Sequence, residues 1–464
     1  MQLSTSSILS IIDNNFKSDE IHALVRQTKF IQRNSSKIKG HEFVKALVLP
    51  SAGICEESLN GLCQRMREFN PLADLSAPAL VQRINTFSAA KFMKEVFTKF
   101  LNSARESLEK QYTSLNGVLT AFNNVLIQDS TVFELNKKLA GILPGTKRGG
   151  KKGGSSCVSQ IKIDMIYNFS TGKIQDAHTY EGKRPDQAST SRIEQLINKN
   201  DLVIRDLGYF KISSLEMIED AQAYFISRFP AHVKVFLNQN DTEPLNLATY
   251  MNKHFKHRKM IDFPVWISDN RLKVRMVAYR VPKDIVAKRR RITHKRAKEM
   301  GRTTSQEKLL LLDFSLFVTN IPLEMVSGEI IGTIYRIRWE IELIFKQWKS
   351  QLKLDFLNGV NIFRIECLMY ARLCTVLILA HITAGFMNLA RWLCEGELSP
   401  LKLIEYLFRN GNLSRAFQTQ TLDEFENRMI QDIPKRLLKD KRSRTTMRQR
   451  IIESETYYDW CYSV

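Results

Sequence analysis

Four side chains between positions 335 and 349 could take part in chemistry, because their spacing places them on one face of an expected helix. At 100° per residue, Tyr335, Arg338, Glu342 and Lys349 lie within about 60° of the helix circumference. The simplest interpretation is a solvated helix face with an Arg338–Glu342 ion pair, which contributes roughly 0.3 kcal/mol. The functional interpretation is a site in which Arg and Lys bind phosphate beside the carboxylate.

The same stretch carries a second, apolar stripe, which indicates how the helix is held. Its members lie within about 80° of one another and are Ile334, Ile337, Ile341, Ile344 and Trp348. An apolar face of this width packs against a protein core. The sequence therefore predicts a helix over residues 334–349, with one face buried and the other presenting the four polar side chains.

The polar residue types and their spacing, Tyr-x2-Arg-x3-Glu-x6-Lys, resemble the signature helix of bacterial insertion-sequence transposases of the DDE class that carry a Tyr-Arg-Glu-Lys (YREK) motif. Four fixed residue types at fixed spacings arise by chance in a chain of this length only on the order of a few times in a thousand. The resemblance implies that Glu342 is the third metal-binding carboxylate of an active site. It also implies that Tyr335, Arg338 and Lys349 bind DNA at the end of the mobile element.

Two aspartates follow apolar segments that are expected to be β-strands. Asp129 follows the strand 124–128 and opens an expected strand-to-helix junction, while Asp206 follows the strand 202–205. The carboxyl ends of such strands gather side chains over one edge of an α/β sheet. Taken singly, each aspartate is more simply a helix cap or a turn residue. With Glu342 behind them in the chain, they resemble the first and second catalytic aspartates of the same family.

Asp129, Asp206 and Glu342 are therefore the candidate catalytic and metal-binding residues. Phosphodiester cleavage needs an activated nucleophile and a stabilised leaving oxygen, and two divalent ions about 3.5–4 Å apart provide both. Carboxylate oxygens are ligands that Mg²⁺ prefers, so two Mg²⁺ ions are the expected cofactor, and Mn²⁺ is expected to substitute. The resemblance implies a transposase that nicks DNA at the terminal repeats of an element and joins the freed 3′-OH to a target.

The charge balance favours a polyanionic partner. The 464 residues include 69 Lys and Arg against 48 Asp and Glu, which gives a net charge of +21. Such an excess favours nucleic acid over an acidic small molecule. A run that begins at Lys288 holds eight Lys and Arg by residue 302, and a block of this kind is usually exposed and often contacts nucleic acid. The resemblance implies double-stranded DNA as the partner, both transposon ends and target, and a homodimer in the synaptic complex.

The order of the expected elements predicts an α/β RNase H-like core, a mixed sheet flanked by helices, with a β-rich insertion and helical regions at both ends. A hairpin, a helix, a strand, a helix and a further strand precede the insertion, and the signature helix follows it. The expected divisions are a helical DNA-binding region at 1–105, the first part of the core at 106–228, a β-rich basic insertion at 229–310, the last core strand with the signature helix at 311–352, and a helical region at 353–464.

No segment indicates secretion, but one is apolar enough to raise the question of a membrane. Residues 1–7 have no basic region followed by a long apolar run. Between Arg372 and Arg391 lie 18 uncharged residues, the lower limit for a span, yet the polar residues among them favour a buried core helix. The seven cysteines form no Cys-x2-Cys pair, which favours reduced thiols over a zinc site. We expect no membrane partner and a cytoplasmic, nucleoid-associated protein.

Two other classes of protein stay open as alternatives. A non-catalytic DNA-binding regulator of transposition would keep the fold without cleavage, and a related structure-specific nuclease would cut DNA without joining it. The chain also departs from those family members that place a Trp before the signature helix to hold a flipped base during hairpin formation, because Phe314 and Ser315 stand there. Phe314 would stack less strongly, and Trp266 is another candidate, but both aromatics are more simply core residues.

Overall fold

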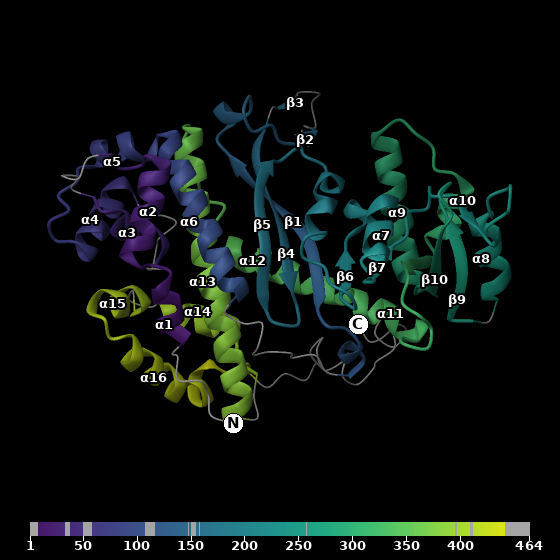
Figure 1. The fold of residues 1–464 in the computed structure, drawn as a ribbon. Coiled ribbons are helices and arrows are strands. Elements are labelled where there is room, and N and C mark those ends of the chain that lie inside the picture. The colour runs from purple at the N-terminus through teal and green to yellow at the C-terminus, as the bar shows by residue number, and fades with distance from the viewer. Residues whose placement is uncertain are drawn as a thin grey trace.

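The centre of the molecule is a mixed sheet, which the computed structural model builds from nine strands in the order β5-β4-β1-β6-β7-β11-β10-β9-β8 (Figure 1). The structure describes residues 8–32, 38–49, 58–106, 117–146, 148–149, 155–156, 158–256, 258–357, 359–394, 397–408 and 412–440. Residues 1–7, where a secretion signal would begin, lie outside these ranges. The strands of the sheet are β1 Val125–Leu135, β4 Ser159–Asn168, β5 Lys173–Glu181, β6 Leu202–Arg205, β7 Tyr224–Arg228, β8 Val235–Phe236, β9 Met260–Ile267, β10 Leu272–Arg280 and β11 Phe314–Thr319, while β2 Arg148–Gly149 and β3 Ser155–Ser156 pair separately.

Five of the strands form the expected RNase H-like half of the sheet. β1, β6 and β7 run parallel, and the β4–β5 hairpin lies antiparallel beside β1. All four residues of β6 are buried, as expected for a short apolar strand covered on both faces. The register pairs Gln128 of β1 with Arg205 of β6. Asp129 and Asp206 therefore come one position later on neighbouring strands, at the same level of the sheet.

The first strand is longer than the sequence predicts. β1 does not end at Gln128 but continues to Leu135, and it pairs with β4 from Leu126 to Leu135. The prediction of a strand-to-helix junction at Asp129 is therefore wrong. The β-branched and aromatic residues that follow favour a strand, and β4 offers them an unbroken ladder of backbone partners. Asp129 stands in the middle of a strand, opposite Met165.

Between β7 and the signature helix the chain extends the same sheet. β11 pairs antiparallel with β7, and β10, β9 and β8 follow outward in turn. The helices of this part of the chain are α8 Leu247–Phe255, α9 Lys283–Glu299 and α10 Gln306–Leu311, and α7 Ile212–Asp220 joins β6 to β7. The basic run that begins at Lys288 lies in α9, in which no residue is buried. The expected exposure of that run is confirmed.

The signature segment is helical, but it is not one uninterrupted α-helix as the sequence predicts. α11 Gly328–Tyr335 passes through a 3-10 turn at Arg336–Arg338 into α12 Trp339–Ser350. Residues three apart eclipse in a 3-10 turn, which aligns the side chains of Tyr335 and Arg338. The apolar stripe is buried as predicted, completely at Ile334, Ile337 and Ile341, nearly so at Trp348, and partly at Ile344.

Helices from both ends of the chain pack together beside β5 (Figure 1). The N-terminal helices are α1 Ile8–Asn14, α2 Ser18–Thr28, α3 Gly40–Val48, α4 Leu59–Phe69, α5 Ala77–Ile84 and α6 Phe87–Glu106, and the C-terminal ones are α13 Ile362–Leu393, α14 Pro400–Phe408, α15 Asn412–Thr419 and α16 Leu422–Asp432. α13 packs along α6 and also contacts α3 and β5. One continuous apolar core runs from these helices to the face of the sheet that α12 covers.

Among the described helices, α13 is long and apolar enough to cross a membrane. Within its apolar part, Ile362–Ala390, 72% of an 18-residue apolar stretch is buried inside the protein. Length and composition alone are weak evidence for a membrane span, since a core helix passes the same test. The burial of α13 agrees with the core helix that the sequence favours.

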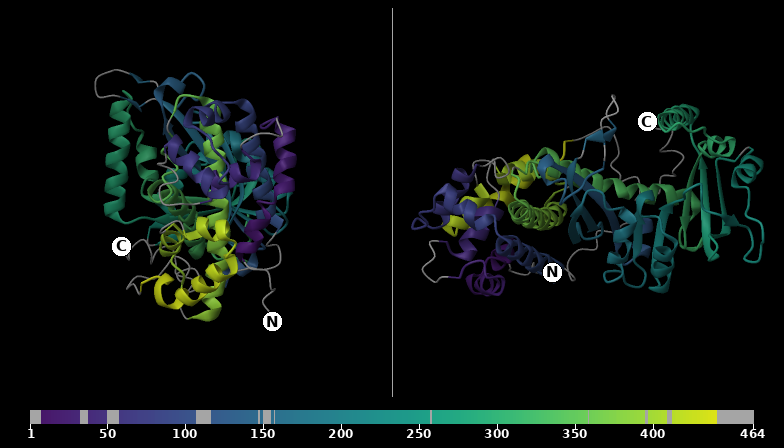
Figure 2. Two further views of the ribbon diagram at one scale, coloured as in Figure 1. Left: turned by 90° about the vertical axis from the view of Figure 1, so that its left-hand side faces the viewer. Right: turned by 90° about the horizontal axis from the view of Figure 1, so that it is seen from above.

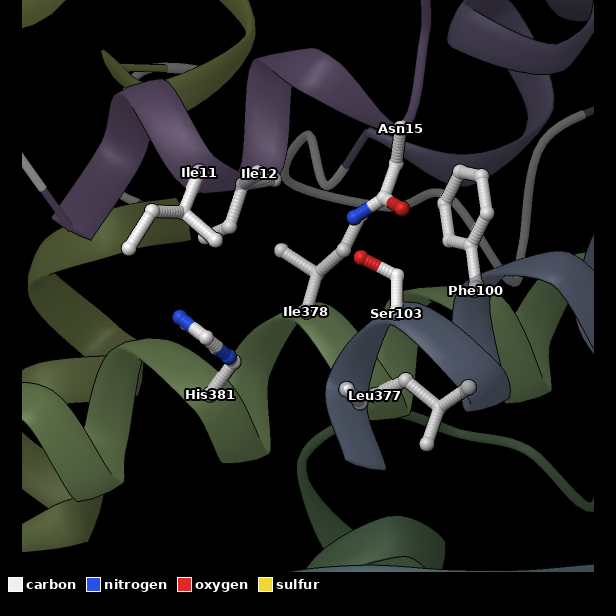
Figure 3. A pocket seen from close by; sticks show the side chains of 9 residues that line it. Ile11, Ile12, Asn15, Phe100, Ser103, Leu377, Ile378 and His381 are labelled. Carbon is white, nitrogen blue, oxygen red and sulfur yellow. The ribbon is translucent and has the colours of Figure 1, made fainter. Parts of the chain in front are cut away.

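A small cavity lies where α1, α6 and α13 meet (Figure 3). It is lined by the polar side chains of Asn15, Ser103 and His381 among apolar ones, and its volume is about 10 Å³, room for about one water molecule. Burial lowers the pKa of His381 to about 4, so its ring is neutral at pH 7. The cavity is therefore a feature of packing and is too small for an organic ligand.

Candidate active site

Three carboxylates from distant parts of the chain meet around one guanidinium group. Arg338 Nη1 lies 3.3 Å from Asp129 Oδ2 and 2.7 Å from Glu342 Oε1, and Arg338 Nε lies 3.8 Å from Asp206 Oδ1. Asp129 comes from the middle of β1, Asp206 directly follows β6, and Glu342 lies one turn beyond Arg338 in α12. The structure thus brings the three acids singled out in the sequence to one place, with a residue of the same helical stripe between them.

The surroundings of this cluster concentrate negative charge. The side chain of Asp129 is 16% exposed, whereas that of Asp206 is 45% exposed. Burial raises the pKa of Asp129 to about 7, against the effect of the Ser130 backbone N–H and of Arg338, while the charges of the other two acids add to the rise. Burial alone would lower the pKa of Arg338, but Tyr335 and the acids raise it. The guanidinium therefore stays charged and compensates the carboxylates.

Tyr335 and Lys349 also make their contacts with β1 and with the residue that follows β6. The Tyr335 hydroxyl donates to Asp206 Oδ1 at 3.3 Å, and its ring packs edge-on against Phe317 with 5.0 Å between ring centroids. Burial, and after it the charge of Asp206, raises the pKa of Tyr335, so the phenol stays a donor. Lys349 Nζ donates to the Val132 carbonyl of β1 at 3.2 Å. All four residues of the polar stripe are thus turned toward the same two strands.

The donor set fits a divalent metal ion in its chemistry. Within the described residues, no three Asp, Glu, His or Cys side chains are arranged closely enough to hold an ion. Asp129, Asp206 and Glu342 surround the guanidinium of Arg338 instead. The buried Nε of Arg338 makes no hydrogen bond within the described part of the chain. Carboxylate oxygens are the hard ligands that Mg²⁺ takes, and buried carboxylates require a compensating cation. A divalent ion would supply at this point the positive charge that Arg338 supplies in the structure.

A buried hydrogen-bond network supports the two aspartates from the other face of the sheet. Asp164 of β4 is 1% exposed, and it accepts hydrogen bonds from the Tyr209 hydroxyl at 2.6 Å and from Gln128 Nε2 at 3.0 Å. Gln128 directly precedes Asp129, and Tyr209 lies in the 3-10 turn that follows Asp206. Successive side chains of a strand point to opposite faces. One buried carboxylate thus fixes the backbone beside both candidate ligands.

A second acid of this supporting layer, Asp186, holds the turn after Asp206. Asp186 Oδ1 accepts from Lys162 Nζ and from Ser130 Oγ, both at 2.9 Å. A Cβ atom on Gly208 would lie 2.8 Å from Asp186 Oδ2, closer than real Cβ atoms approach. Glycine at this position therefore lets the turn pack directly on the Asp186 carboxylate.

Sequence reasoning missed three residues of this region: Tyr209, Asp164 and Arg228. Arg228 is the last residue of β7, and the pairing of Arg205 with Ser227 places it beside Asp206. Its charge is close enough to lower the pKa of Tyr335, against the larger effects of burial and Asp206. A sequence signal for Arg228 existed, since it lies at the carboxyl end of β7, as Asp206 lies just beyond the carboxyl end of β6. Nothing in the local sequence links Asp164 to the turn that holds Tyr209.

The aromatic candidates for base stacking lie away from the carboxylates. Phe314 is buried and packs against Phe255, with 4.5 Å between ring centroids. It leaves β11 on the face opposite to Phe317, which contacts Tyr335. Trp266 belongs to β9, four strands away from β6 in the sheet, and is half-buried. Phe314 is thus a core residue, as the sequence favoured.

Comparison with known proteins identifies the family. A family model described as a transposase DDE domain matches residues 120–378, which is more than half of the chain. The transposase for insertion sequence element IS1151 of Clostridium perfringens is 27% identical over 432 residues, which cover 89% of this chain and 87% of the relative. The transposase for insertion sequence element IS231F of Bacillus thuringiensis subsp. israelensis is 28% identical over 400 residues, which cover 83% and 81%.

Among solved structures, the chain is similar to a piggyBac transposase in a synaptic complex with hairpin DNA. The two share 12% sequence identity and a TM-score of 0.41, over 96% of this chain and 87% of the other, a likeness too low to define the fold. The family match and the insertion-sequence relatives are independent of it. The family implies binding of DNA and use of a divalent metal. The chain belongs to the transposases with a DDE domain, and it is a bacterial insertion-sequence transposase that catalyses transposition.

Proposed function

We propose that Asp129, Asp206 and Glu342 are the catalytic residues of DNA cleavage and strand transfer, and that together they hold two Mg²⁺ ions, for which Mn²⁺ substitutes. The observation that supports this assignment is the meeting of all three carboxylates at Arg338. A pair of divalent ions supplies an activated nucleophile and a stabilised leaving oxygen. The hydrogen bonds of Asp164 keep the two aspartates in position, since ligand orientation depends on such outer contacts.

We further propose that the polar stripe is the YREK signature, in which Tyr335, Arg338 and Lys349 bind phosphates of the DNA beside the scissile bond. Each of the three is a hydrogen-bond donor at the carboxylate cluster or on β1. The guanidinium of Arg338 binds a phosphate well because of its planar donor geometry, and it would be free to do so if the three carboxylates held metal ions. Arg228, beside Asp206 on β7, adds a fourth donor and a third cation to this set.

The arrangement of the whole protein on DNA belongs to the same proposal. We propose that residues 1–105 bind DNA, that 106–228 and 311–352 form the catalytic core around the insertion 229–310, and that 353–464 form a helical region, of which residues 441–464 lie outside the described ranges. Two chains form a homodimer that holds two transposon ends and the target duplex. The net charge of +21 supports double-stranded DNA as the partner. A protein with this partner works in the bacterial cytoplasm, associated with the nucleoid.

The test of the site removes one carboxylate charge at a time. Asp129→Asn, Asp206→Asn and Glu342→Gln are expected to abolish cleavage of a labelled duplex that carries the terminal repeat from the DNA flanking the gene, and to leave binding of that duplex within about threefold of the parent protein. Asp220→Asn, an exposed acid of α7, is the matched control and should cleave normally. Cleavage that survives any one of the three substitutions would overturn the assignment.

The same substrate separates this proposal from the other classes of protein. A regulator would bind the labelled end without nicking it under Mg²⁺ or Mn²⁺, and a nuclease would nick it without joining the 3′-OH to a second duplex. The proposal predicts both nicking and joining, each dependent on the metal ion. Mixing chains of two lengths in one synaptic complex should yield a mixed species if two copies hold the ends.

A further inference from the structure

The inner side of helix α9 is hydrogen-bonded to the protein, and its outer side is exposed and basic. It projects from the part of the sheet built by β10 and β11 (Figures 1 and 2). On its inner side, Arg289 Nη1 donates to the carbonyls of Leu312 and Phe314 at 3.1 and 2.9 Å, and Arg289 Nη2 donates to Ser315 Oγ at 3.0 Å. Arg290 Nη2 donates to Asp313 Oδ1 at 2.6 Å. These two arginines attach the helix to the segment that leads into β11.

The outer side of α9 carries a stripe of cations. At 100° per residue, Lys288, Arg291, Lys295 and Lys298 lie within about 80° of one another and about 100° or more away from Arg289. All four side chains are exposed. The stripe is about 15 Å long at 1.5 Å per residue. The two acids of α9 stand at its ends, Asp284 in the first turn and Glu299 as the last residue.

Helix α9, which carries this stripe, lies on the same side of the sheet as the carboxylates. Arg289 binds Ser315, and Tyr335 packs on Phe317; both partners leave β11 on one face, because they are two residues apart. Figure 2, seen from above, places α9 and the α11–α12 segment on that side of the sheet. β1 and β11 are separated by three strand spacings, about 14 Å at about 4.8 Å each. That separation is less than half the length of one helical turn of B-DNA, which is about 34 Å, so half a turn of one duplex spans it.

We propose that the outer stripe of α9 binds the sugar-phosphate backbone of the same duplex that is cut at the carboxylates, on the side of the scissile bond that lies toward β11. The inference rests on the proposed position of the active site. A rigid duplex with a phosphate at Arg338 continues past α9 when it runs across the strands. Four exposed cations along about 15 Å match the repeated charge of such a backbone, and the attachment through Arg289 and Arg290 keeps the helix in place.

The experiment measures how DNA binding depends on salt. Lys288→Gln/Lys295→Gln removes two charges from the stripe and leaves the anchoring arginines in place. The control, Lys199→Gln/Lys253→Gln, removes two exposed charges from outside the stripe. Lys199 lies in the loop before β6, at the opposite edge of the sheet from Asp206, and Lys253 lies in α8, which packs on the opposite face. The probe is the full-length protein with the terminal repeat and its flanking DNA. The slope of log K against log salt is negative, and its magnitude is expected to fall by about 2 for the stripe variant. Binding near 0.15 M salt should weaken roughly 10- to 30-fold.

Each outcome decides the proposal. The control pair should keep the parent slope, and both variants should keep the parent melting temperature, since only exposed side chains change. An unchanged slope in a folded stripe variant overturns the proposal, and so does a loss seen only for a separate target duplex in the joining reaction. Because the measurement is of binding, it is independent of whether Asp129, Asp206 and Glu342 catalyse the reaction. If the stripe variant lowers the magnitude of the slope but Asp129, Asp206 and Glu342 prove not to be catalytic, the proposal for α9 therefore stands while the catalytic assignment fails.

Discussion

Removing Arg338 should make the protein bind metal ions more tightly while it destroys DNA cleavage. In the structure the guanidinium lies 2.7–3.8 Å from one oxygen of each of the three carboxylates, so a metal ion must either displace it or bind beside it. Arg338→Met keeps much of the length and apolar contact of the side chain and removes its charge. The variant therefore isolates the electrostatic competition between the guanidinium and the ion.

The size of the effect follows from Coulomb's law. A divalent ion and a guanidinium repel by about 2 kcal/mol at about 4 Å even at the dielectric constant of water, and by about 1 kcal/mol if the side chain swings out to about 7 Å. Metal affinity without DNA should therefore rise roughly 5- to 30-fold, since about 1.4 kcal/mol is a factor of ten. A lower effective dielectric constant would enlarge this gain. Cleavage should fall because Arg338 no longer binds the phosphate.

Mn²⁺ binding without DNA, followed by paramagnetic resonance or calorimetry, measures this effect. A pH near 8 is suitable, because burial raises the pKa of Asp129 to about 7 and the carboxylate must be ionised. Lys253→Met removes one charge from α8, on the other face of the sheet, and should change Mn²⁺ affinity less than twofold. If folded Arg338→Met protein binds Mn²⁺ no more tightly than the parent protein, Arg338 does not compete with metal at these carboxylates.

Three further predictions test the supporting structure. Tyr209→Phe removes the hydrogen bond to the buried carboxylate behind the site and should raise the Mg²⁺ concentration for half-maximal cleavage about 10-fold or more. Tyr370→Phe, which loses a partly buried hydrogen bond between α13 and Thr179 of β5, should leave that concentration unchanged. Gly208→Ala places a Cβ atom 2.8 Å from Asp186 Oδ2 and should lower cleavage at least tenfold and unfolding free energy by about 1–3 kcal/mol; normal values for both would contradict the close packing. His381 has its pKa lowered from 6.5 to about 4, so the unfolded chain takes up its proton first as pH falls. Denaturant titrations should show about 2 kcal/mol less stability at pH 5 than at pH 7 from this group, and His381→Asn should remove that difference.

The sequence by itself determined the parts of this protein that depend on local spacing. A helix repeats every 3.6 residues, so the positions of Tyr335, Arg338, Glu342 and Lys349 fixed a common face before any partner was known. The buried stripe on the same segment followed from the same period, and the alternation of the β4–β5 hairpin followed from the period of two. The succession of β4, β5, β6 and β7 along the chain was also predictable, because each was a short apolar run between turn residues.

Only the tertiary structure decided what depends on distant partners. β1 continues past Asp129 because β4 supplies a ladder of hydrogen bonds. No pattern within residues 129–135 predicts that β4 is the partner. The guanidinium of Arg338 lies among all three acids, not only beside Glu342 one turn away, because packing of α12 on the sheet brings β1 and β6 to it. The bond between Asp164 and Tyr209 joins residues 45 positions apart. Side-chain spacing is a local property of the chain, whereas burial and charge at a site are set by what the fold places around it.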